Sequence, residues 1–309
     1  MTSLESSIDL ETIRTALASQ VVGLGDPGPL RFLGFGFHSY VVETERGIVF
    51  RIARSAEARA RHEREAALLP RIAPHMTTAI PVPIWEAGPS SAIPFGAFGY
   101  ERIAGVAPEA ADIAQSARMV DDLARFLVAL HGLEPNAAGL PDPAATLGTG
   151  LIQLQLGEQV TRVLRDVLDE AEFARLGAWV SDVTGDATFG RFTPRLIHSD
   201  SWYGNWLIDP ASRDLSGVLD FEEVGMGDPA LDFATLRHVS DDFARAVLDR
   251  YQGLGGLVDS DIRHRVQRHW ETRVIHGLQH IIPNDMEDEL EDALAKLREG
   301  PILRPQQPF

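Results

Sequence analysis

The chain has 309 residues, of which 44% are hydrophobic and 24% charged, a composition typical of a folded globular protein with about two domains. Its 45 acidic and 28 basic residues give a formal net charge of −17, which argues against nucleic acid as a partner because such a surface repels phosphate backbones. The absence of cysteine excludes disulfides, zinc–thiolate sites and thiol nucleophiles.

The same acidity would attract cationic ligands such as polyamines, although a high net charge equally serves to keep a protein soluble. The N-terminal stretch MTSLESSIDLETIRTAL has no basic segment followed by an apolar core, so it does not resemble a signal peptide. No run of about 18 apolar residues occurs, so we expect no membrane span. These features favour a cytoplasmic protein without a membrane partner.

The first third of the chain predicts a small sheet with two helices. The expected elements, in chain order, are a helix at 8–21, strands at 30–34, 40–44 and 48–53, a charged helix at 55–72 and a strand at 98–103. Ile8, Ile13 and Leu17 fall on one face of the first helix. Gly34-Phe35-Gly36 separates the first two strands, so we expect a hairpin closed by a glycine loop.

From about residue 113 the pattern becomes mainly helical, with Leu123, Leu127 and Leu130 recurring at helical spacing. Further helices are expected within 152–182 and 259–298, and a loop-and-strand block occupies 196–232. We therefore predict an α+β fold with two lobes. Residues 1–103 would form a small β-rich N-lobe, and residues 104–309 a larger, mainly helical C-lobe.

The strongest chemical signal lies in the loop-and-strand block. Its first part, LIHSDSWYGNWLID at 196–209, contains the pattern H-x-D-x-x-x-x-N, formed by His198, Asp200 and Asn205. Its second part, 217–232, begins with a short apolar strand that ends at Asp220. Any one of these polar residues alone would suit an ordinary hairpin turn, but three in register between apolar strands indicate a catalytic loop.

Phosphoryl transfer accounts for this set of residue types. The transferred group is highly anionic, so the reaction needs Mg²⁺ to neutralise the phosphates of a nucleoside triphosphate, and a carboxylate that orients the attacking hydroxyl and accepts its proton. Mg²⁺ prefers oxygen ligands from a few carboxylates or amides. Asn205 and Asp220 supply such oxygens, which leaves Asp200 for the hydroxyl, while His198 is expected to brace the loop.

The glycine loop upstream fits the same chemistry. Gly34 and Gly36 would let backbone amides approach phosphate, and Ser39 stands where a kinase loop has its third glycine. An ordinary glycine turn is the alternative interpretation.

Arg51 stands in the third strand, where kinases place a lysine that contacts the phosphates and pairs with a helix glutamate. The only lysine of the chain is Lys296, so Arg51 would have to serve, with the geometry of a planar fork instead of a point charge. Glu65 is the expected partner on the following helix and Glu63 is the alternative. Either glutamate could instead lie on a solvated helix face.

Several segments resemble the aminoglycoside phosphotransferase family, a branch of the protein-kinase-like fold. The resemblance runs along most of the chain, through GFGFHSYVVETERGIVFRIAR, REAALLPRI, LARFLVALHGL, LIHSDSWYGNWLID and GVLDFEEVGMGDPALDFATL. The last two segments are specific to the superfamily. The chain looks most similar to the aminoglycoside 2″-phosphotransferases, with some features like those of the macrolide phosphotransferases.

The resemblance implies a bilobal, protein-kinase-like fold that uses Mg²⁺ and either ATP or GTP as the phosphoryl donor. It implies a purine-binding hinge formed by backbone groups near Tyr100-Glu101-Arg102-Ile103. It also implies Asp200 as the catalytic base and Asn205 with Asp220 as magnesium ligands. Asp228 and Asp232, in the segment GDPALD, match family residues that look structural.

The sequence departs from the family pattern at several places. Arg51 replaces the lysine of the 2″ enzymes, although arginine at this strand position also resembles the macrolide phosphotransferases and other relatives. Glu222 follows Asp-Phe where the 2″ enzymes have glycine. Ser199 stands at a position often taken by glycine or asparagine. The loop is also unusually aromatic, and its rings serve either as packing residues or as the lining of an acceptor pocket: Trp202, Tyr203 and Trp206.

Acidic residues of the helical lobe are candidates for binding the acceptor, since carboxylates bind the ammonium groups of an aminoglycoside through charge-assisted hydrogen bonds. The candidates are Asp241, Asp242 and Glu271, although each could equally be a solvated acid on a surface helix. We therefore expect an O-phosphotransferase acting on an aminoglycoside. The alternatives are a kinase of a less cationic acceptor, such as a macrolide or a metabolite alcohol, and a nucleotide-binding protein with weak catalysis.

Overall fold

The computed structural model describes residues 9–36, 38–133, 156–284, 286–304 and 309. These residues form two compact units, each considered by itself below. Unit 1 contains the described residues up to Glu109 together with Gly204–Val224, and unit 2 contains the remainder. Residues 204–224, far along the chain, therefore fold together with its N-terminal part.

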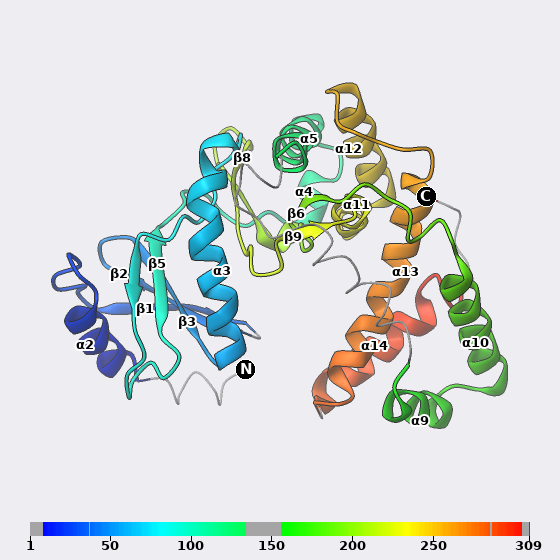
Figure 1. The fold of residues 1–309 in the computed structure, drawn as a ribbon, viewed down its shortest axis with the longest axis horizontal. Coiled ribbons are helices and arrows are strands. Elements are labelled where there is room, and N and C mark those ends of the chain that lie inside the picture. The colour runs from blue at the N-terminus through cyan, green and yellow to red at the C-terminus, as the bar shows by residue number, and fades with distance from the viewer. Residues whose placement is uncertain (1–8, 37, 134–155, 285, 305–308) are drawn as a thin grey trace. The chain divides into compact units, whose positions relative to one another are not determined.

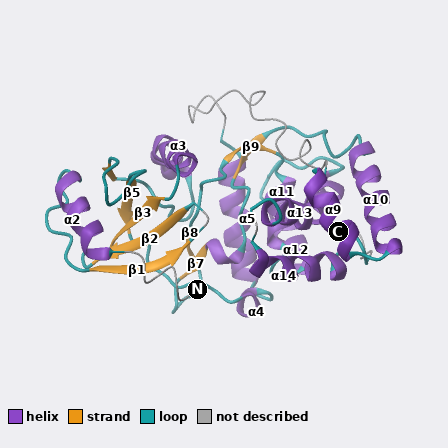
Figure 2. Ribbon diagram, turned by 90° about the horizontal axis from the view of Figure 1, so that it is seen from below, coloured by secondary structure: helices purple, strands orange, loops and turns teal. Residues whose placement is uncertain are grey.

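Unit 1 is built on a five-stranded antiparallel sheet (Figures 1 and 2). In spatial order its strands are β1 (Leu30–Phe35), β2 (Ser39–Thr44), β3 (Ile48–Ala53), β5 (Ala97–Glu101) and β4 (Trp85–Ala87). Helices α2 (Leu10–Gln20) and α3 (Ala56–Ile72) lie on different sides of this sheet, and the 3₁₀ turn η1 (Ala73–His75) follows α3. Both helices begin at side-chain caps, Asp9 and Ser55, which accept hydrogen bonds from free backbone N–H groups of the first turn.

Side-chain alternation along β3 separates the two sides of the sheet. Phe50 and Ile52 pack in one core with Leu17 of α2, whereas Val49 packs in a separate cluster with Phe98 and Tyr100 of β5. Because successive side chains of a strand point to opposite faces, residue 51 shares the face of Val49 and is directed to the side on which α3 lies.

The late segment of unit 1 is a hairpin of β7 (Trp206–Ile208) and β8 (Leu215–Val218), preceded by the 3₁₀ turn η2 (Tyr203–Asn205). Val106 and Ile208 exchange backbone hydrogen bonds of 3.0 and 2.9 Å, which join this hairpin to the chain that follows β5. Trp206 is fully buried, so this aromatic residue of the loop is a packing residue.

Unit 2 is mainly helical (Figure 2). Its elements are α4 (Ala110–Ile113), α5 (Ala117–His131), α9 (Glu158–Val167), α10 (Glu170–Gly185), β6 (Arg195–Ile197), β9 (Gly225–Gly227), α11 (Ala230–Leu236), α12 (Asp241–Gly253), α13 (Ile262–Ile281) and α14 (Glu287–Glu299). Helix α5 packs on α12, α11 packs on α13, and α13 packs on α14. Strands β6 and β9 pair as a short antiparallel ribbon that frames the start of the predicted catalytic loop.

The predicted strands and helices of unit 1 agree with the structure to within one or two residues, except that β4 was missed because it is only three residues long and follows two prolines. Ile8 lies outside the described residues. The helical stretch predicted at 152–182 is two helices, α9 and α10, separated near Asp169, and residues 152–155 lie outside the described part. The stretch at 259–298 likewise divides into α13 and α14, while α11 and α12 were not resolved from the sequence.

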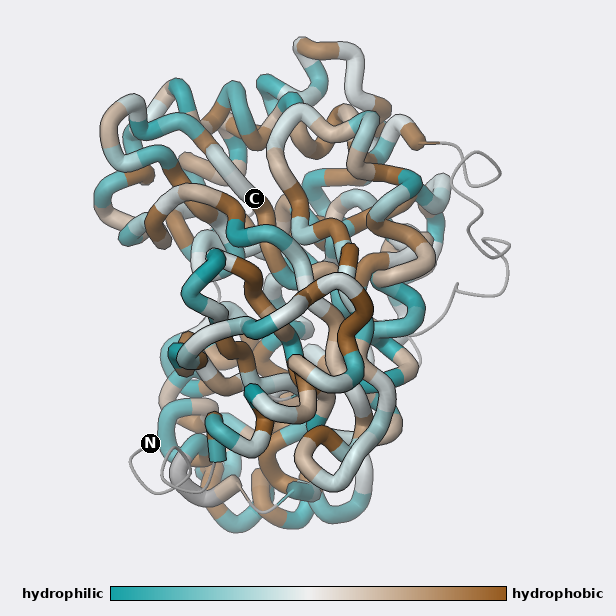
Figure 3. The backbone as a smooth tube through the Cα atoms, turned by 90° about the vertical axis from the view of Figure 1, so that its left-hand side faces the viewer, coloured by the Kyte–Doolittle hydropathy of each residue, from teal (hydrophilic) through white to brown (hydrophobic). Residues whose placement is uncertain are grey.

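Apolar stretches of the chain are short and alternate with polar ones, as the brown and teal segments of Figure 3 show. Among the helices that the structure describes, none combines the length and the hydrophobicity needed to cross a membrane. The α+β class, with a small antiparallel sheet and a larger helical part, agrees with the prediction. The division of the chain into lobes at residue 104 stays a prediction.

Candidate active site

The hairpin β1–β2 carries the predicted glycine loop. Gly34 pairs with Val41 within the hairpin, and Gly36 N donates to Ser39 O at 2.8 Å, so the second glycine closes the turn. The buried Ser39 hydroxyl lies 2.8 Å from His62 Nε2 and ties the base of the loop to α3. Burial lowers the pKa of His62 to about 3, so its ring is neutral in this contact.

A cation that sequence reasoning missed also holds the glycine loop. Arg54, which follows β3, donates from Nη1 to Gly36 O at 2.7 Å. Its guanidinium lies 3.9 Å from the centroid of the Phe35 ring, a cation–π contact. The sequence did contain a signal for this contact. Phe35 stands between two glycines, and Arg54 directly follows β3.

Arg51, itself buried, lies at the centre of a cluster of acids in unit 1, of which Glu65 is buried and Glu222 and Asp220 are partly exposed. Its Nη1 donates to Glu65 Oε2 at 2.9 Å, which is the ion pair expected from the order of the chain. Its Nη2 donates to Glu222 Oε2 at 2.8 Å and lies 3.0 Å from Asp220 Oδ1. Glu63, the alternative partner, is exposed and pairs with an arginine of its own helix.

One guanidinium cannot balance three carboxylates in this cluster. Burial raises the pKa of Glu65 to about 8 despite the neighbouring Arg51, and burial together with the charge of Asp220 raises the pKa of Glu222 to about 7. Burial alone would lower the pKa of Arg51, but the carboxylates around it, Glu65 first, raise it. At neutral pH the proton that Glu65 keeps, and the fraction of Glu222 that is protonated, offset this deficit of positive charge.

Asn205 and Asp220 come together at one end of the hairpin β7–β8. Asn205 directly precedes β7, and Leu219 N, just after β8, donates to Asn205 O at 2.8 Å. Asp220 has a φ of +63°, a left-handed conformation that is uncommon for a residue other than glycine. Strain of this kind persists where surrounding contacts impose it, often at functional sites.

These two residues fit a magnesium ion by their chemistry. Asp220 Oδ1 is buried and accepts no hydrogen bond of acceptable geometry, and Asn205 adds an amide oxygen. Among the described residues, no three histidine, aspartate or glutamate side chains form a group able to hold a metal. Mg²⁺ does not require one, because it binds through one or two protein oxygens while phosphates and water complete its shell.

The predicted hinge, Tyr100-Glu101-Arg102-Ile103, runs from the buried end of β5 to the exposed connection after it. Arg102 N donates to Gly47 O at 2.8 Å, which fixes the chain just beyond the strand. Ile103 lies against Gly217 of β8, where an added Cβ would come within 2.6 Å of the isoleucine side chain. Burial raises the pKa of Tyr100 to about 12, so the phenol stays neutral.

In unit 2, Asp232 anchors the loop that carries Asp200. Its fully buried carboxylate accepts hydrogen bonds from His198 N at 2.9 Å and Ser199 N at 2.7 Å, and it lies 3.1 Å from His131 Nε2. His198 Nδ1 in turn accepts from Asp200 N at 3.3 Å, which is the bracing role expected of it. Ser199 has a φ of +71°, which explains why glycine or asparagine suits this position.

A cation that the sequence analysis did not identify lies beside Asp200. Arg273 Nη2 on α13 is 3.4 Å from Asp200 Oδ1, and the two side chains are 29% and 35% exposed. The ring of His238 lies 5.8 Å from that of Trp202 and 5.0 Å from that of Trp270. Burial, followed by Arg273, lowers the pKa of His238 to about 4, so this ring is uncharged at neutral pH.

The three acids predicted to bind the acceptor already have basic partners within unit 2. Asp241, Asp242 and Glu271 pair with Arg237, Arg245 and Arg268 at 2.7, 3.1 and 3.1 Å, respectively. Glu271 is buried and also accepts from Trp179 Nε1 at 2.9 Å. Asp242 is the most exposed of the three, at 89%.

Asp228 shows the structural role expected for the segment GDPALD. Its buried Oδ2 lies 2.9 Å from both Arg265 Nε and His269 Nε2, and its Oδ1 accepts from Ala230 N at 3.1 Å. Burial would raise the pKa of this carboxyl, but the contacts with His269 and Arg265 lower it. The acid is therefore held ionised by donors of its own chain.

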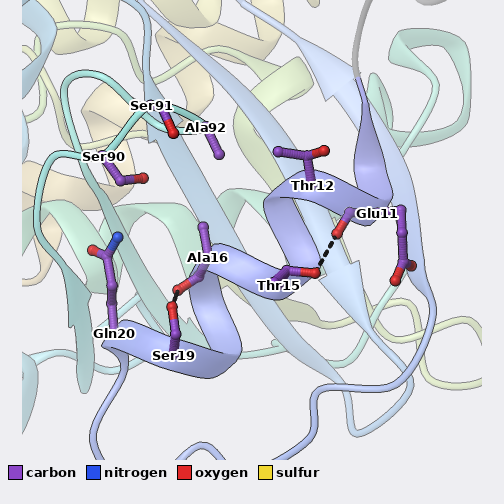
Figure 4. Close-up of a pocket in the computed structure, with 9 residues that line it drawn as sticks. All are labelled: Glu11, Thr12, Thr15, Ala16, Ser19, Gln20, Ser90, Ser91 and Ala92. Atoms are coloured by element: carbon purple, nitrogen blue, oxygen red, sulfur yellow. Dashed lines mark hydrogen bonds between the residues drawn. The ribbon is translucent and has the colours of Figure 1, made fainter.

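A hollow of about 340 Å³ in unit 1 contains none of the predicted site residues (Figure 4). It is lined by mostly polar residues of α2 and by the segment Ser90–Ala92. Thr15 and Ser19 already donate their hydroxyl groups to carbonyl oxygens of α2. We assign no role to this hollow.

Residues 30–269 match the model of the phosphotransferase enzyme family, so the match runs from β1 into α13 and covers more than half of the chain. The chain belongs to this family. As a member, it is a small-molecule kinase, which is the enzyme class predicted from the loop 196–209.

One curated relative of this phosphotransferase is viomycin phosphotransferase from Streptomyces vinaceus, which is 31% identical over 109 residues. That alignment covers 34% of this chain and 37% of the relative, so the chain matches little more than a third of the relative's length. The similarity is thus local.

Solved structures resemble this phosphotransferase over nearly its whole length. An aminoglycoside 2″-phosphotransferase with GDP and kanamycin has a TM-score of 0.79 at 22% identity, over 94% of this chain and 98% of that one. Macrolide 2′-phosphotransferase type I has a TM-score of 0.69 at 22% identity, over 96% and 98%. The predicted kinase-like fold and the predicted likeness to both groups are confirmed.

Proposed function

We propose that this phosphotransferase transfers the γ-phosphate of ATP or GTP to a hydroxyl group of an aminoglycoside-type antibiotic, with Asp200 as the base. The observation that carries the proposal is the anchored loop of unit 2. Asp232 and His198 hold the backbone from His198 to Asp200, and the Asp200 carboxylate remains 35% exposed. A carboxylate that is fixed but open to solvent suits proton transfer from a substrate hydroxyl.

In this proposal Asp200 orients the acceptor hydroxyl and takes its proton. The hydroxyl oxygen forms a bond to the γ-phosphorus, the bond from that phosphorus to the bridging oxygen breaks, and the nucleoside diphosphate leaves. Positioning accounts for most of the catalysis in such reactions, because the protein itself makes no covalent bond. The anchoring of the loop by Asp232 supplies that positioning on the acceptor side.

The residues of unit 1 are assigned to the donor. Asn205 and Asp220 would hold Mg²⁺, which when bound neutralises charge on the phosphate oxygens. The residues proposed to bind or position the nucleotide are Gly34, Gly36, Ser39, Arg51, Glu65, Tyr100, Glu101 and Ile103. We keep residues 1–103 as the N-lobe and residues 104–309 as the C-lobe, which carries the catalytic loop 196–209, the metal-binding segment 217–232 and the acceptor-binding helices. Relatives solved with GDP, ADP or ATP support a purine nucleotide as donor.

An aminoglycoside acceptor is supported by two observations. The net charge of −17 favours the approach of a polycation. Neighbouring structures contain kanamycin, gentamicin or streptomycin. Of the predicted acceptor-binding acids Asp241, Asp242 and Glu271, we expect Asp242 to contribute, because it is the one that stays exposed.

A second candidate is a less cationic acceptor, such as a macrolide or a metabolite alcohol. It is favoured by the cation Arg273 at 3.4 Å from Asp200 and by the neighbouring rings of Trp202, His238 and Trp270. A positive charge beside the proposed base disfavours an ammonium group at the same place, whereas aromatic rings suit an apolar face.

The test is a turnover assay with MgATP and MgGTP against kanamycin, gentamicin, streptomycin and a macrolide, followed by mass spectrometry for a phosphorylated product. We expect a product with at least one aminoglycoside and none with Asp200→Asn. A product with the macrolide alone would replace the aminoglycoside by the second candidate. No product with any acceptor, and no Mg²⁺-dependent nucleotide hydrolysis, would leave only a nucleotide-binding protein with weak catalysis.

A further inference from the structure

The guanidinium of Arg51 joins two segments of unit 1 that are far apart in the sequence. Its Nη1 holds Glu65 of α3 at 2.9 Å, and its Nη2 holds Glu222, 171 residues further along the chain than Arg51, at 2.8 Å. Both Nη atoms are thus engaged by carboxylates on different elements. Arg51 therefore acts as a bridge between α3 and the chain that follows β8.

The surroundings fix the orientation of this bridge. The Arg51 side chain is 9% exposed, and its Cζ lies 5.6 Å from the centroid of the Phe98 ring on one side. His62 packs edge-on against the same ring at 4.7 Å, so Phe98 has little room to move. A guanidinium held in this way presents its two Nη atoms in fixed directions, whereas a lysine ammonium would present a single nitrogen.

Asp220 lies between the two points at which its segment is held. Before it, Leu219 N donates to Asn205 O at 2.8 Å, and after it, Glu222 accepts from Arg51 at 2.8 Å. Asp220 itself has a left-handed φ of +63°, which is uncommon for a residue other than glycine. Its Oδ1 lies 3.0 Å from the same Nη2 that holds Glu222.

We propose that Glu222 is a positioning residue: through Arg51 it holds the segment 220–222 so that the Asp220 carboxylate is placed for metal binding, and Arg51 and Glu222 function as a matched pair. The proposal rests on the proposed magnesium-dependent function. The two departures from the pattern of the 2″ enzymes, arginine at 51 and glutamate at 222, meet in this one contact. The glutamate also lies 3.9 Å from His38 Nε2, a longer contact that leaves Arg51 as its main partner.

The pairing makes a specific prediction about coupled substitutions. Replacing Arg51 by lysine leaves one nitrogen for two carboxylates and leaves Glu222 buried beside Asp220 without its partner. Replacing Glu222 by glutamine in addition removes that uncompensated charge. The double variant should therefore bind Mg²⁺–nucleotide better than the lysine variant alone. If the two residues acted independently, the second substitution would instead weaken binding further.

The experiment measures nucleotide binding by calorimetry as a function of Mg²⁺ concentration in wild type, Glu222→Gln, Arg51→Lys and the double variant, with melting curves to verify folding. We expect Glu222→Gln to raise the Mg²⁺ concentration for half-maximal binding about tenfold, as changes to residues that orient metal ligands do. Arg51→Lys should raise it further, and the double variant should recover part of that loss. In turnover, Glu222→Gln should raise the Mg²⁺ requirement with little change in kcat at saturating Mg²⁺.

Glu223→Gln is the matched control. Glu223 lies next to Glu222 and also pairs with an arginine, Arg61 of α3, but its side chain is half exposed. We expect it to change the Mg²⁺ requirement by less than about twofold, as for an exposed ion pair.

Different failures have different meanings. Wild-type protein that binds no Mg²⁺–nucleotide would overturn the proposed function and this inference together. Wild-type binding with a folded Glu222→Gln variant of unchanged Mg²⁺ requirement would overturn the inference alone. So would a double variant whose loss is the product of the two single losses, because that result would show that Arg51 and Glu222 act independently.

Discussion

The acids around Arg51 in unit 1 and the acid Asp228 in unit 2 have opposite electrostatic environments. In unit 1, Glu65, Asp220 and Glu222 share Arg51, and the pKa values of both glutamates are raised. In unit 2, Asp228 accepts from Arg265, His269 and a backbone N–H, and its pKa is lowered. The comparison teaches that acidity alone does not mark a ligand site. Acids that lack donors are suited to an added cation, whereas acids saturated with donors hold the fold together.

Asp186 repeats the unit 2 pattern. Burial would raise its pKa, but hydrogen bonds from Thr188, His264 and Arg268 lower it well below its ordinary range. These contacts join the end of α10 to α13. Asp200 belongs to neither pattern, since it is partly exposed and its cationic neighbour Arg273 lies at the long distance of 3.4 Å.

The largest effect is expected at Asp200. Asp200→Asn should lower kcat by about 10²- to 10⁴-fold, the usual contribution of a general base, because the amide cannot accept the hydroxyl proton. Nucleotide affinity should stay within a few fold of wild type, since the donor-binding residues are assigned to unit 1. Steady-state kinetics and calorimetry measure the two quantities. Wild-type turnover by this variant would remove Asp200 from its proposed role.

The variant Asp232→Ala tests whether a buried acid of unit 2 that accepts several hydrogen bonds stabilises the fold. Asp232→Ala leaves the N–H groups of His198 and Ser199 and the ring of His131 without their acceptor in a buried place. Each unpaired buried donor costs about 1–3 kcal/mol, so we expect a loss of about 3 kcal/mol or more in the free energy of unfolding. Urea denaturation measures it.

Asp249→Ala is the control for this change, because Asp249 lies on α12 of the same unit and forms an exposed ion pair with Arg263. Its loss should cost less than about 1 kcal/mol. Equal costs for the two variants would contradict the distinction between saturated buried acids and surface acids.

Sequence reasoning succeeded where the signal is local. The strand that ends at Ala53 showed an apolar pattern interrupted by Arg51. The loop His198–Asn205 was located by residues at fixed spacing, and its catalytic role stays a proposal. The Arg51–Glu65 pair was also predictable, because a strand followed directly by a helix brings neighbouring segments together.

Contacts between segments far apart in the sequence were not predictable. Nothing in the local pattern around Glu222 indicates Arg51, 171 residues earlier, and helical periodicity on α13 does not indicate that Arg273 lies beside Asp200. The basic partners of Asp241 and Glu271 were missed for a different reason. They lie only four and three residues earlier, at the spacing of helical ion pairs, so the sequence did contain a local signal for them.

The pH dependence of stability sharpens the comparison at Glu65. Its folded pKa of about 8 lies above the ordinary value of 4.5, so the folded protein holds a proton that the unfolded chain releases. The resulting stabilisation is fully present below about pH 4.5 and is lost as the pH rises through about 8. We expect the melting temperature to fall from pH 5 to pH 8 less steeply in Glu65→Gln than in wild type.

Glu63→Gln provides the control, since Glu63 lies on the same helix, is 63% exposed and pairs with Arg59. This variant should keep the wild-type slope of melting temperature against pH. If the melting temperature of Glu65→Gln fell with pH as steeply as that of the wild type, Glu65 would not be the group that holds the extra proton in the folded protein.

The smallest effect is expected at Asp242, the exposed acid that distinguishes the two acceptor classes. Its side chain is 89% exposed and pairs with Arg245 at 3.1 Å, so an acceptor ammonium group could exchange with that partner. Exposed charge pairs contribute about 0.2–1 kcal/mol, so Asp242→Ala should raise the KM of an aminoglycoside by about two- to fivefold without changing kcat. Kinetics with a neutral acceptor, whose KM should not move, separate this from a general disturbance of α12. An unchanged KM for every aminoglycoside would mean that Asp242, like the buried acids of unit 2, serves only its own chain, and the acceptor would then be sought among less cationic alcohols.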